Sequence, residues 1–420
     1  MDETALKERV RAARGKFLAM ASTYALGTFN DNFFKQALML LALRAGKGNL
    51  QGQATVIFCL PFLIFAGHAG WLADRFPKQR IVIGAKALEL GAMIVGAVGI
   101  CTGNMTLVLV MLGLMGAWAA FFSPALNGSI PELYPAEYVP TANAFVKAAT
   151  TAAILLGIAT AGIALDLKGP EMAGIPFGRV AVAVTIIVIA LLGLAASLWV
   201  PLRPAASPAA PFPWTGPFDA LRELWMTRRD FALAAIIALD AFIWFAGSTQ
   251  ALLINKMGVD QLGVSDTLTS AFLAAELIGI AIGGVLAARL ASRRDWRGLL
   301  APATAGMGLL MALMAALPGV GAGQHALIGL TIGGIGVCGG LALIPCESFI
   351  QVRPAPHKKG AVIAAGNFAA FAAILISGPV ANALNRNMLP TSAFALIGLA
   401  AVAVAIIVAL IKPRMMNDAP

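Results

Sequence analysis

The chain has 420 residues, of which 59% are hydrophobic and 12% charged, with a mean hydropathy of +0.84 and a formal net charge of +10. Soluble domains carry about 25% charged residues, so this composition excludes a soluble domain and predicts an all-α polytopic membrane protein. The four cysteines have neither CxxC nor metal-ligand spacing, so neither a disulfide framework nor a zinc site is expected.

Twelve apolar runs follow one another along the chain, each long enough to cross a bilayer core. No removable signal peptide is expected, because the first sixteen residues are too charged and no small-residue cleavage site follows the first run. The predicted helices span residues 17–43, 51–73, 81–101, 105–130, 137–165, 178–201, 232–257, 265–291, 298–317, 324–350, 359–384 and 391–412.

Basic residues are distributed unequally between the two sides of these spans. With the N-terminus inside, twenty-one of the thirty Lys and Arg residues fall on the inner side, six on the outer side and three within spans. Loops rich in Lys and Arg stay in the cytoplasm, so both termini are predicted to be cytoplasmic. The net charge therefore reflects topology and does not indicate nucleic-acid binding.

The longest loop separates six predicted helices from six. Residues 201–230 are rich in Pro and Ala and then become basic and amphipathic, as is typical of a linker. We therefore predict an N-terminal six-helix bundle at 1–201, a cytoplasmic linker at 202–231 and a C-terminal six-helix bundle at 232–420.

A sequence repeat supports two related halves. GWLADRFPKQR, starting at Gly70 after the second helix, aligns without gaps with GVLAARLASRR, starting at Gly284 after the eighth. Inner loops commonly contain a small residue and arginines, but the equivalent position of both stretches favours an internal repeat.

The first of these stretches resembles the loop signature of the major facilitator superfamily, whose members rock two six-helix bundles about a midplane site. In that family the Asp and Arg of the motif hold neighbouring helix ends together in one conformation. The second copy has Ala288 at the position of the acidic residue, so the stronger latch is expected in the first half. The resemblance implies a conformational latch made by Gly70, Asp74, Arg75 and Arg80, with Lys78 beside them and Arg289 in the second copy.

Polar residues are concentrated in the first predicted span. Asp31 and Lys35 are four residues apart on one helix face and can pair; Asn30, Asn32 and Gln36 surround them. Such residues can simply join helices through hydrogen bonds. Alternatively, because ionised groups within a membrane are costly and usually functional, this helix lines a cavity in which Asp31 meets a cation or proton and Lys35 an anion.

Other spans contain further ionisable groups. Lys86 and Glu89 are three residues apart, which favours a self-satisfied pair over a binding site. Glu347 lies near the inner end of its helix, where it can face water. Lys147 and Asp240 have no local partner, so we expect them to line a cavity.

Aromatic residues accompany these polar groups. Phe29 and Phe33 flank Asp31 and serve either as ordinary packing residues or as the apolar end of a pocket for an amphiphile. The sequence shows no Ser/His/Asp set, Walker loop or dinucleotide fingerprint. An enzyme, an ATP-driven pump and a bound cofactor are therefore not expected.

Three stretches carry distinctive motifs: FNDNFFKQALMLL in the first helix, SPALNGSIPEL starting at Ser123, and ANAFVKAATTAAILLG starting at Ala142. Together they resemble the lysophospholipid transporter family and the transporter domain fused to acyl-transferring enzymes. The family carries a G/N-D-N element in the first stretch, S-P-A-K-Y-G-x-x-x-E-L in the second and K-A-N-x-x-x-E-A in the third. The matching residues are Asp31, Asn32, Ser123, Pro124, Glu132, Leu133 and Asn143.

The chain departs from the family at three positions. Leu126 replaces a lysine, Lys147 replaces a glutamate, and an arginine expected in the seventh helix falls near Gln250 and Ala251. Either the basic contact has moved to Lys147, which we favour, or the head group differs. The candidate substrate-binding residues are Phe29, Asp31, Asn32, Phe33, Lys35, Asn143, Lys147, Asp240 and Gln250.

The resemblance implies a secondary transporter that moves lysophospholipids, such as lysophosphatidylethanolamine, from the outer to the inner leaflet of a bacterial inner membrane for re-acylation. A monomer is expected, with membrane lipid and a cytoplasmic-side acyltransferase as partners. One alternative is a proton-coupled exporter of a small organic cation or drug, in which Asp31 titrates. Another is a non-transporting scaffold or receptor, in which the buried charges neutralise one another.

Overall fold

The computed structural model describes residues 3–127, 139–202, 204, 212–291, 296–317, 322–355 and 359–417. These residues form helices joined by short connections, and no strand occurs among them. Nine of the described helices are long and apolar enough to cross a membrane, and two shorter apolar helices lie at 49–65 and 105–121. The all-α polytopic class predicted from the sequence is confirmed.

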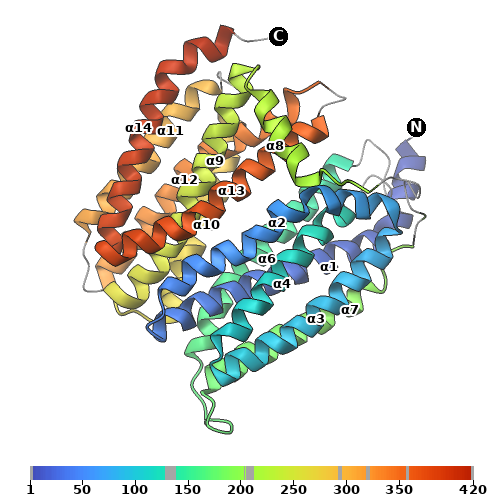
Figure 1. Ribbon diagram of the computed structural model, residues 1–420, viewed down its shortest axis with the longest axis vertical. Coiled ribbons are helices and arrows are strands. Elements are labelled where there is room, and N and C mark those ends of the chain that lie inside the picture. The colour runs from blue at the N-terminus through green and yellow to red at the C-terminus, as the bar shows by residue number, and fades with distance from the viewer. Residues whose placement is uncertain are drawn as a thin grey trace. The chain divides into compact units, whose positions relative to one another are not determined.

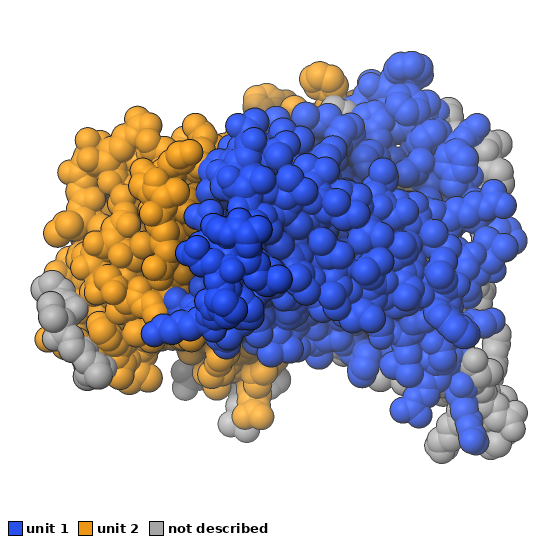
Figure 2. Space-filling model, turned by 90° about the horizontal axis from the view of Figure 1, so that it is seen from below, with its two compact units in different colours: residues 1–38, 60–217 blue, residues 39–59, 218–420 orange. Residues whose placement is uncertain are grey.

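Two compact units divide the chain. Unit 1 contains residues 1–38 and 60–217, and unit 2 contains residues 39–59 and 218–420 (Figure 2). The passage between Pro217 and Phe218 falls within the predicted linker, while the segment 39–59 belongs to the second unit. The predicted division into two six-helix bundles is not decided by this partition and stays a prediction.

The helices of unit 1 come from the first half of the chain (Figure 1). The first two helices each pass from one unit to the other, because the segment 39–59 lies in unit 2. The bounds are α1 Glu3–Arg44, α2 Asn49–Arg75, α3 Lys78–Thr102, α4 Met105–Asn127, α6 Val139–Asp166 and α7 Phe177–Ser197. The first helix starts well before the predicted residue 17, because its charged N-terminal turns continue the apolar span as one helix.

Unit 2 contains the remaining helices. A twelve-residue helix, α8 Gly216–Thr227, occupies the amphipathic end of the predicted linker. The others are α9 Phe231–Lys256 with the π-helical η1 Met257–Gln261, α10 Asp266–Ala291, α11 Arg297–Leu313 with the 3₁₀ turn η2 Met314–Ala316, α12 Ala322–Val352, α13 Lys359–Asn387 and α14 Pro390–Asn417.

Each unit has its own apolar core. In unit 1, Phe17, Met20, Val82 and Val146 bring α1, α3 and α6 together. In unit 2 a larger cluster joins α9, α11, α12 and α14. At one end of this second cluster, Nε of Arg353 donates a hydrogen bond to Asp230 Oδ2 at 2.8 Å. Asp230 also caps α9, because its side chain accepts a hydrogen bond from the Leu233 amide.

Small residues allow α10 and α12 to pack backbone against backbone. A Cβ built on Gly279 would lie 2.1 Å from the carbonyl oxygen of Gly333, and one on Gly340 would lie 2.2 Å from that of Ile280. Real Cβ atoms never come this close to a carbonyl oxygen, so only glycine permits the contact. Small residues at such crossings are the usual device of membrane helices, which gain little from apolar burial against one another.

Substitution of Gly279 by valine should therefore separate α10 from α12. We expect the apparent melting temperature in detergent to fall by about 5 °C or more, since overpacking costs about 1–3 kcal/mol and 1 kcal/mol shifts the melting point of a large domain by about 2–4 °C. Gly84→Val is the matched control, because Gly84 is an exposed helical glycine whose Cβ would meet no atom within 4 Å. Equal melting temperatures for the two variants would contradict this account.

Candidate functional site

A buried polar cluster lies in unit 1, where α3 packs beside α7 (Figure 1). Lys86 and Glu89 form an ion pair with Nζ and Oε2 2.5 Å apart, and their side chains are only 2% and 4% exposed. Asn30 of α1 donates to Glu89 Oε1 at 3.4 Å and to the Ile186 carbonyl of α7 at 3.1 Å. The predicted pair is thus confirmed, and it also links three helices.

Two glycines make room for the lysine of this pair. A Cβ on Gly27 of α1 would lie within clashing distance of Lys86 Nζ, and one on Gly193 of α7 would lie 3.7 Å from the same atom. The ammonium group therefore occupies a space that neighbouring side chains would otherwise fill. The ammonium group of Lys86 has lost most of its contact with water. Its ion pair with Glu89 is therefore needed to offset the free energy of desolvation.

Asp31 lies next to this cluster on α1. Its Oδ1 is buried and finds no hydrogen-bond partner among the described residues, whereas Glu89, Lys35 and Lys86 all interact with it electrostatically. The interaction with Lys35 agrees with the four-residue spacing that predicted it. We call Asn30, Asp31, Lys35, Lys86 and Glu89 the unit 1 polar cluster; it holds carboxylate and ammonium groups within an apolar bundle.

The aromatic candidates lie on the same helix but differ in exposure. Phe29 and Phe33 stack with ring centroids 5.7 Å apart and an interplanar angle of 17°. Phe33 is 1% exposed, whereas Phe29 is half-buried. Asn32 donates its side-chain amide to the Thr28 carbonyl at 2.8 Å, beside the close approach of Gly157 from α6. Phe29 therefore offers the more accessible apolar surface of the pair.

The candidates on α6 and on the stretch before it are only partly described. Lys147 is exposed on α6, one turn before the buried Thr150, which donates to the Lys147 carbonyl at 3.0 Å. The side chain of Asn143 lies outside the described residues. The same holds for the side chains of the other motif residues, Ser123, Pro124, Leu126, Glu132 and Leu133.

Unit 2 has a buried carboxylate of its own, on α9. Asp240 of α9 is 4% exposed, and its Oδ1 finds no hydrogen-bond partner among the described residues. Its electrostatic neighbour is Glu347 of α12, adjacent to the buried thiol of Cys346. Two carboxyl groups brought together in an apolar environment favour a shared proton or an approaching cation.

Gln250 lies two to three turns further along α9. It is 1% exposed and its Nε2 finds no partner among the described residues. Near it, a Cβ built on Gly247 would lie 4.0 Å from Oε1 of Glu276, a buried carboxyl group of α10. The neighbouring Ser248 accepts a 2.8 Å hydrogen bond from Ser377 of α13. The middle of α9 thus contacts α10 and α13 through polar groups.

The latch candidates lie at two helix ends. Arg75 and Arg289, which correspond in the repeat, both occupy the last turn of their helices, α2 and α10. The guanidinium of Arg75 lies 5.5 Å from the ring centroid of Trp71, and Arg80 is exposed. Gly70 and Asp74 lie within α2, but their side chains are outside the described residues.

Two contacts and one buried carboxyl group at these sites were not predicted. The contacts are the hydrogen bond from Asn30 to Glu89 and the proximity of Glu347, which was expected to face water, to Asp240. The carboxyl group is that of Glu276. The available signal was an ionisable residue inside an apolar run. That signal identifies the residue but does not specify which helix faces it.

The chemistry of these groups suits the binding of a charged ligand. In the described part of the chain, no group of three or more His, Cys, Asp or Glu side chains could hold a metal ion. Apart from the exposed Lys147, the described candidate polar groups of the two units are buried or half-buried, carry both signs of charge and lie among apolar helices. The polar groups can bind the charged or zwitterionic part of a ligand, and the apolar helices around them can contact its hydrocarbon part.

Solved structures with the same helix arrangement are transporters. A structure of a proton-dependent oligopeptide transporter matches 97% of this chain and 100% of its own with a TM-score of 0.72 at 15% identity. A D-xylose-proton symporter matches 94% of this chain and 96% of its own with a TM-score of 0.70 at 14% identity. At these identities the likeness establishes the fold, and the predicted major facilitator fold is confirmed.

Sequence relatives are closer. The family model of the Major Facilitator Superfamily matches residues 15–379. The lysophospholipid transporter LplT of Enterobacter sp. (strain 638) is 30% identical over 358 residues, which cover 82% of both chains. The protein of the same name from Yersinia enterocolitica is 29% identical, covering 84% of this chain and 82% of its own. The chain therefore belongs to the major facilitator superfamily and, within it, to the lysophospholipid transporter family.

Proposed function

We propose that this protein moves lysophospholipids, such as lysophosphatidylethanolamine, from the outer to the inner leaflet of a bacterial inner membrane by alternating access. The observation that carries the proposal is the unit 1 polar cluster, where Oδ1 of Asp31 lies beside Lys35 and Lys86 and has no hydrogen-bond partner in the described part of the chain. The head group of a zwitterionic lysophospholipid has a positive charge that can pair with a carboxylate and a negative charge that can pair with an ammonium group. The acyl chain of the lipid requires apolar surroundings.

In this proposal the ammonium group of the substrate lies near Asp31, and its phosphate lies near Lys35 or Lys147. Asn32, Asn143, Asp240 and Gln250 complete the polar surface, with Phe29 and Phe33 on the apolar side. Lys147 is the exposed cation of this set, which suits a group that meets an arriving anion. The departures from the family motifs then move the basic contact to α6 without removing it.

The remaining assignments follow from the same proposal. Both termini lie in the cytoplasm, the protein acts as a monomer and as a transporter without an enzymatic activity of its own, and a cytoplasmic-side acyltransferase re-acylates the delivered lipid. The bundles 1–201 and 232–420 alternate about the site, joined by the linker 202–231. Gly70, Asp74, Arg75 and Arg80, with Arg289 in the second copy, form the latch at the inner ends of the helices.

The test has two parts: selective thermal stabilisation of the protein by lysophospholipids, and then lysophospholipid transport in proteoliposomes. A ligand that binds only the folded protein raises its stability as its concentration exceeds Kd. We therefore expect lysophospholipids below their micelle concentration to raise the melting temperature, whereas matched diacyl lipids and small organic cations do not. In proteoliposomes, lysolipid movement should proceed without a proton gradient. Stabilisation by soluble cations alone, with a pH dependence, would contradict the proposal and support the proton-coupled exporter.

A further inference from the structure

The twelve-residue helix α8 carries an exposed apolar side that the proposed function does not use. Phe218, Leu221 and Trp225 follow one another at helical spacing and therefore lie on one side of the helix. Their side chains are exposed, with relative exposures of 69%, 45% and 62%. Large apolar side chains that cluster on a surface in this way mark a contact with a membrane or with another protein.

The rest of α8 divides into a protein-facing side and a charged side. Ala220, Leu224 and Thr227 form the protein-facing side: Ala220 and Thr227 are buried, and Leu224 packs against the apolar core of unit 2. Asp219 and Glu223 lie one turn apart on the remaining side. A helix at the boundary between a bilayer and water needs these three sides, because it meets protein, lipid and water at once.

The place of α8 in the chain puts it at the membrane surface. The helix ends at Thr227, and a candidate membrane span begins at Phe231 (Figure 1). The residues between them, 228–230, extend about 11 Å at most. The junction is also fixed, because Asp230 caps α9 and accepts a hydrogen bond from Arg353. α8 therefore stays beside the surface where this span enters the bilayer, which favours lipid over a soluble protein as its partner.

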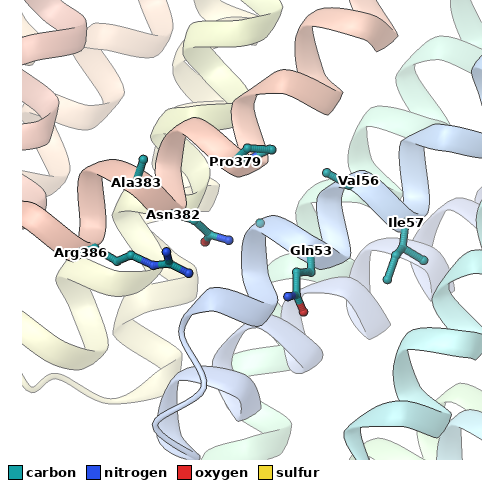
Figure 3. A pocket seen from close by; sticks show the side chains of 8 residues that line it. Gln53, Val56, Ile57, Pro379, Asn382, Ala383 and Arg386 are labelled. Carbon is teal, nitrogen blue, oxygen red and sulfur yellow. The ribbon is translucent and has the colours of Figure 1, made fainter.

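Arg228, one residue after α8, has the setting of an arginine at a lipid surface. It is exposed, and its guanidinium lies 3.7 Å from the ring centroid of Trp225. Arg386 of α13 is a contrast within unit 2: it lines a cavity of about 450 Å³, its side chain extends toward α2, and its Nε donates to Asn49 Oδ1 at 3.3 Å (Figure 3). Arg386 thus links two helices. A guanidinium stacked on a tryptophan, as in Arg228, keeps the N–H donors in its plane available for a phosphate.

We propose that α8 is an interfacial helix that binds phospholipids of the inner leaflet, with Phe218, Leu221 and Trp225 among the upper acyl chains and Arg228 on a lipid phosphate. Tryptophan and arginine both suit the boundary between head groups and acyl chains, because each joins an apolar body to a polar end. The leaflet follows from the predicted topology, which places the linker in the cytoplasm. The proposal is separate from the transported substrate, since bilayer phospholipids supply both groups that α8 contacts.

In this arrangement α8 belongs to the second half of the protein and not to the connection between the halves. Its protein-facing side packs against the unit 2 core, and lipid holds its apolar side. The part of the predicted linker that can extend between the two bundles then reduces from 202–231 to 202–215. A shorter connection limits how far two domains can separate.

Spin-label accessibility tests which side of α8 meets lipid. The full-length protein, with its four cysteines replaced by alanine, carries a label at Phe218→Cys or Leu221→Cys, and the matched controls carry it at Asp219→Cys or Glu223→Cys. In vesicles of phosphatidylethanolamine and phosphatidylglycerol, we expect the first two labels to meet oxygen more often than a water-soluble nickel chelate, at a depth of about 5–10 Å. The two controls should show the reverse.

Two results of this measurement would overturn the proposal. One is equal access of the nickel chelate to all four labels. The other is free access of the chelate to the labels at 218 and 221 until a cytoplasmic protein fraction is added, because the apolar side would then bind a soluble partner.

Trypsin cleavage after Arg222 gives a second measurement that keeps the native cysteines. A protease cuts a helix in its transiently opened state, so the rate reports how firmly α8 is held. In nanodiscs of the same lipids, Phe218→Ser should raise the rate about fivefold, because moving half of a phenylalanine side chain from lipid to water costs about 1 kcal/mol. Glu223→Ser is the matched control on the charged side and should change the rate by about twofold or less.

Equal cleavage rates for Phe218→Ser and Glu223→Ser would contradict the proposal. Neither measurement depends on lysophospholipid transport, so a failure of either one leaves the proposed function intact.

Discussion

Replacement of Asp31 by alanine should reduce lysophospholipid transport at least about 30-fold while the protein remains folded. Asp31 is half-buried, and the Oδ1 atom of its carboxylate is buried without a hydrogen-bond partner among the described residues. In the proposed complex the carboxylate meets the substrate ammonium. Loss of one partner from a buried charge pair costs about 2–5 kcal/mol, which sets the size of the effect. The measurement is the initial rate of lysophosphatidylethanolamine movement in proteoliposomes, corrected for reconstituted protein.

Asp31→Asn keeps the shape of the side chain and should be nearly as defective, which separates charge from packing. Asp260→Asn is the matched control, since Asp260 is 41% exposed and pairs with Lys256 on the surface at 3.1 Å. It should transport at the wild-type rate. Normal uptake by Asp31→Ala would remove Asp31 from the binding site and reduce the cluster to a structural role.

Removal of either charge from the Lys86–Glu89 pair should destabilise the protein strongly. Both side chains are almost fully buried, so Lys86→Met removes the cation paired with the Glu89 carboxylate, and Glu89→Gln removes the carboxylate paired with the Lys86 ammonium. Breaking a buried ion pair from one side costs about 3–5 kcal/mol, which corresponds to a fall in apparent melting temperature of roughly 10 °C. Thermal unfolding in a mild detergent measures it.

The double variant Lys86→Met/Glu89→Met should recover much of the loss, because neither charge is then left unpaired. Lys256→Met provides the surface comparison: its pair with Asp260 is also local but has side chains 24% and 41% exposed, and its removal should change stability by less than about 1 kcal/mol. A double variant as unstable as the sum of the two single ones would show that each residue acts separately.

The fold was predictable because a backbone that crosses lipid must satisfy its own hydrogen bonds, which an α-helix does within a single segment. Hydropathy and length located the spans, for example α7, predicted at 178–201 and observed at Phe177–Ser197. The start of α1 was misplaced, because a charged segment outside the bilayer gives no hydropathy signal when it continues the same helix. The composition of the segment 39–59 likewise says nothing about which unit it joins, since that depends on contacts distant in sequence.

The site was predictable only where partners are close in sequence. The Lys86–Glu89 pair followed from its three-residue spacing, and the interaction of Asp31 with Lys35 followed from a four-residue one. The contact from Asn30 to Glu89 joins residues 59 positions apart, and no periodicity within one helix encodes it. The interaction of Asp240 with Glu347 was missed for the same reason, because it joins α9 to α12.

The local pairing of Lys86 with Glu89 also has a consequence for how the protein is made. A single charge at the centre of a spanning segment raises its insertion free energy by about 2.5–3.5 kcal/mol. Because the two opposite charges of α3 lie one turn apart on the same helix, the segment can leave the translocon as a neutral unit before α7 has been synthesised. α9 has no cation between Phe231 and Asn255 to accompany Asp240, so its insertion depends on its hydropathy and on Arg228 and Arg229 just before it.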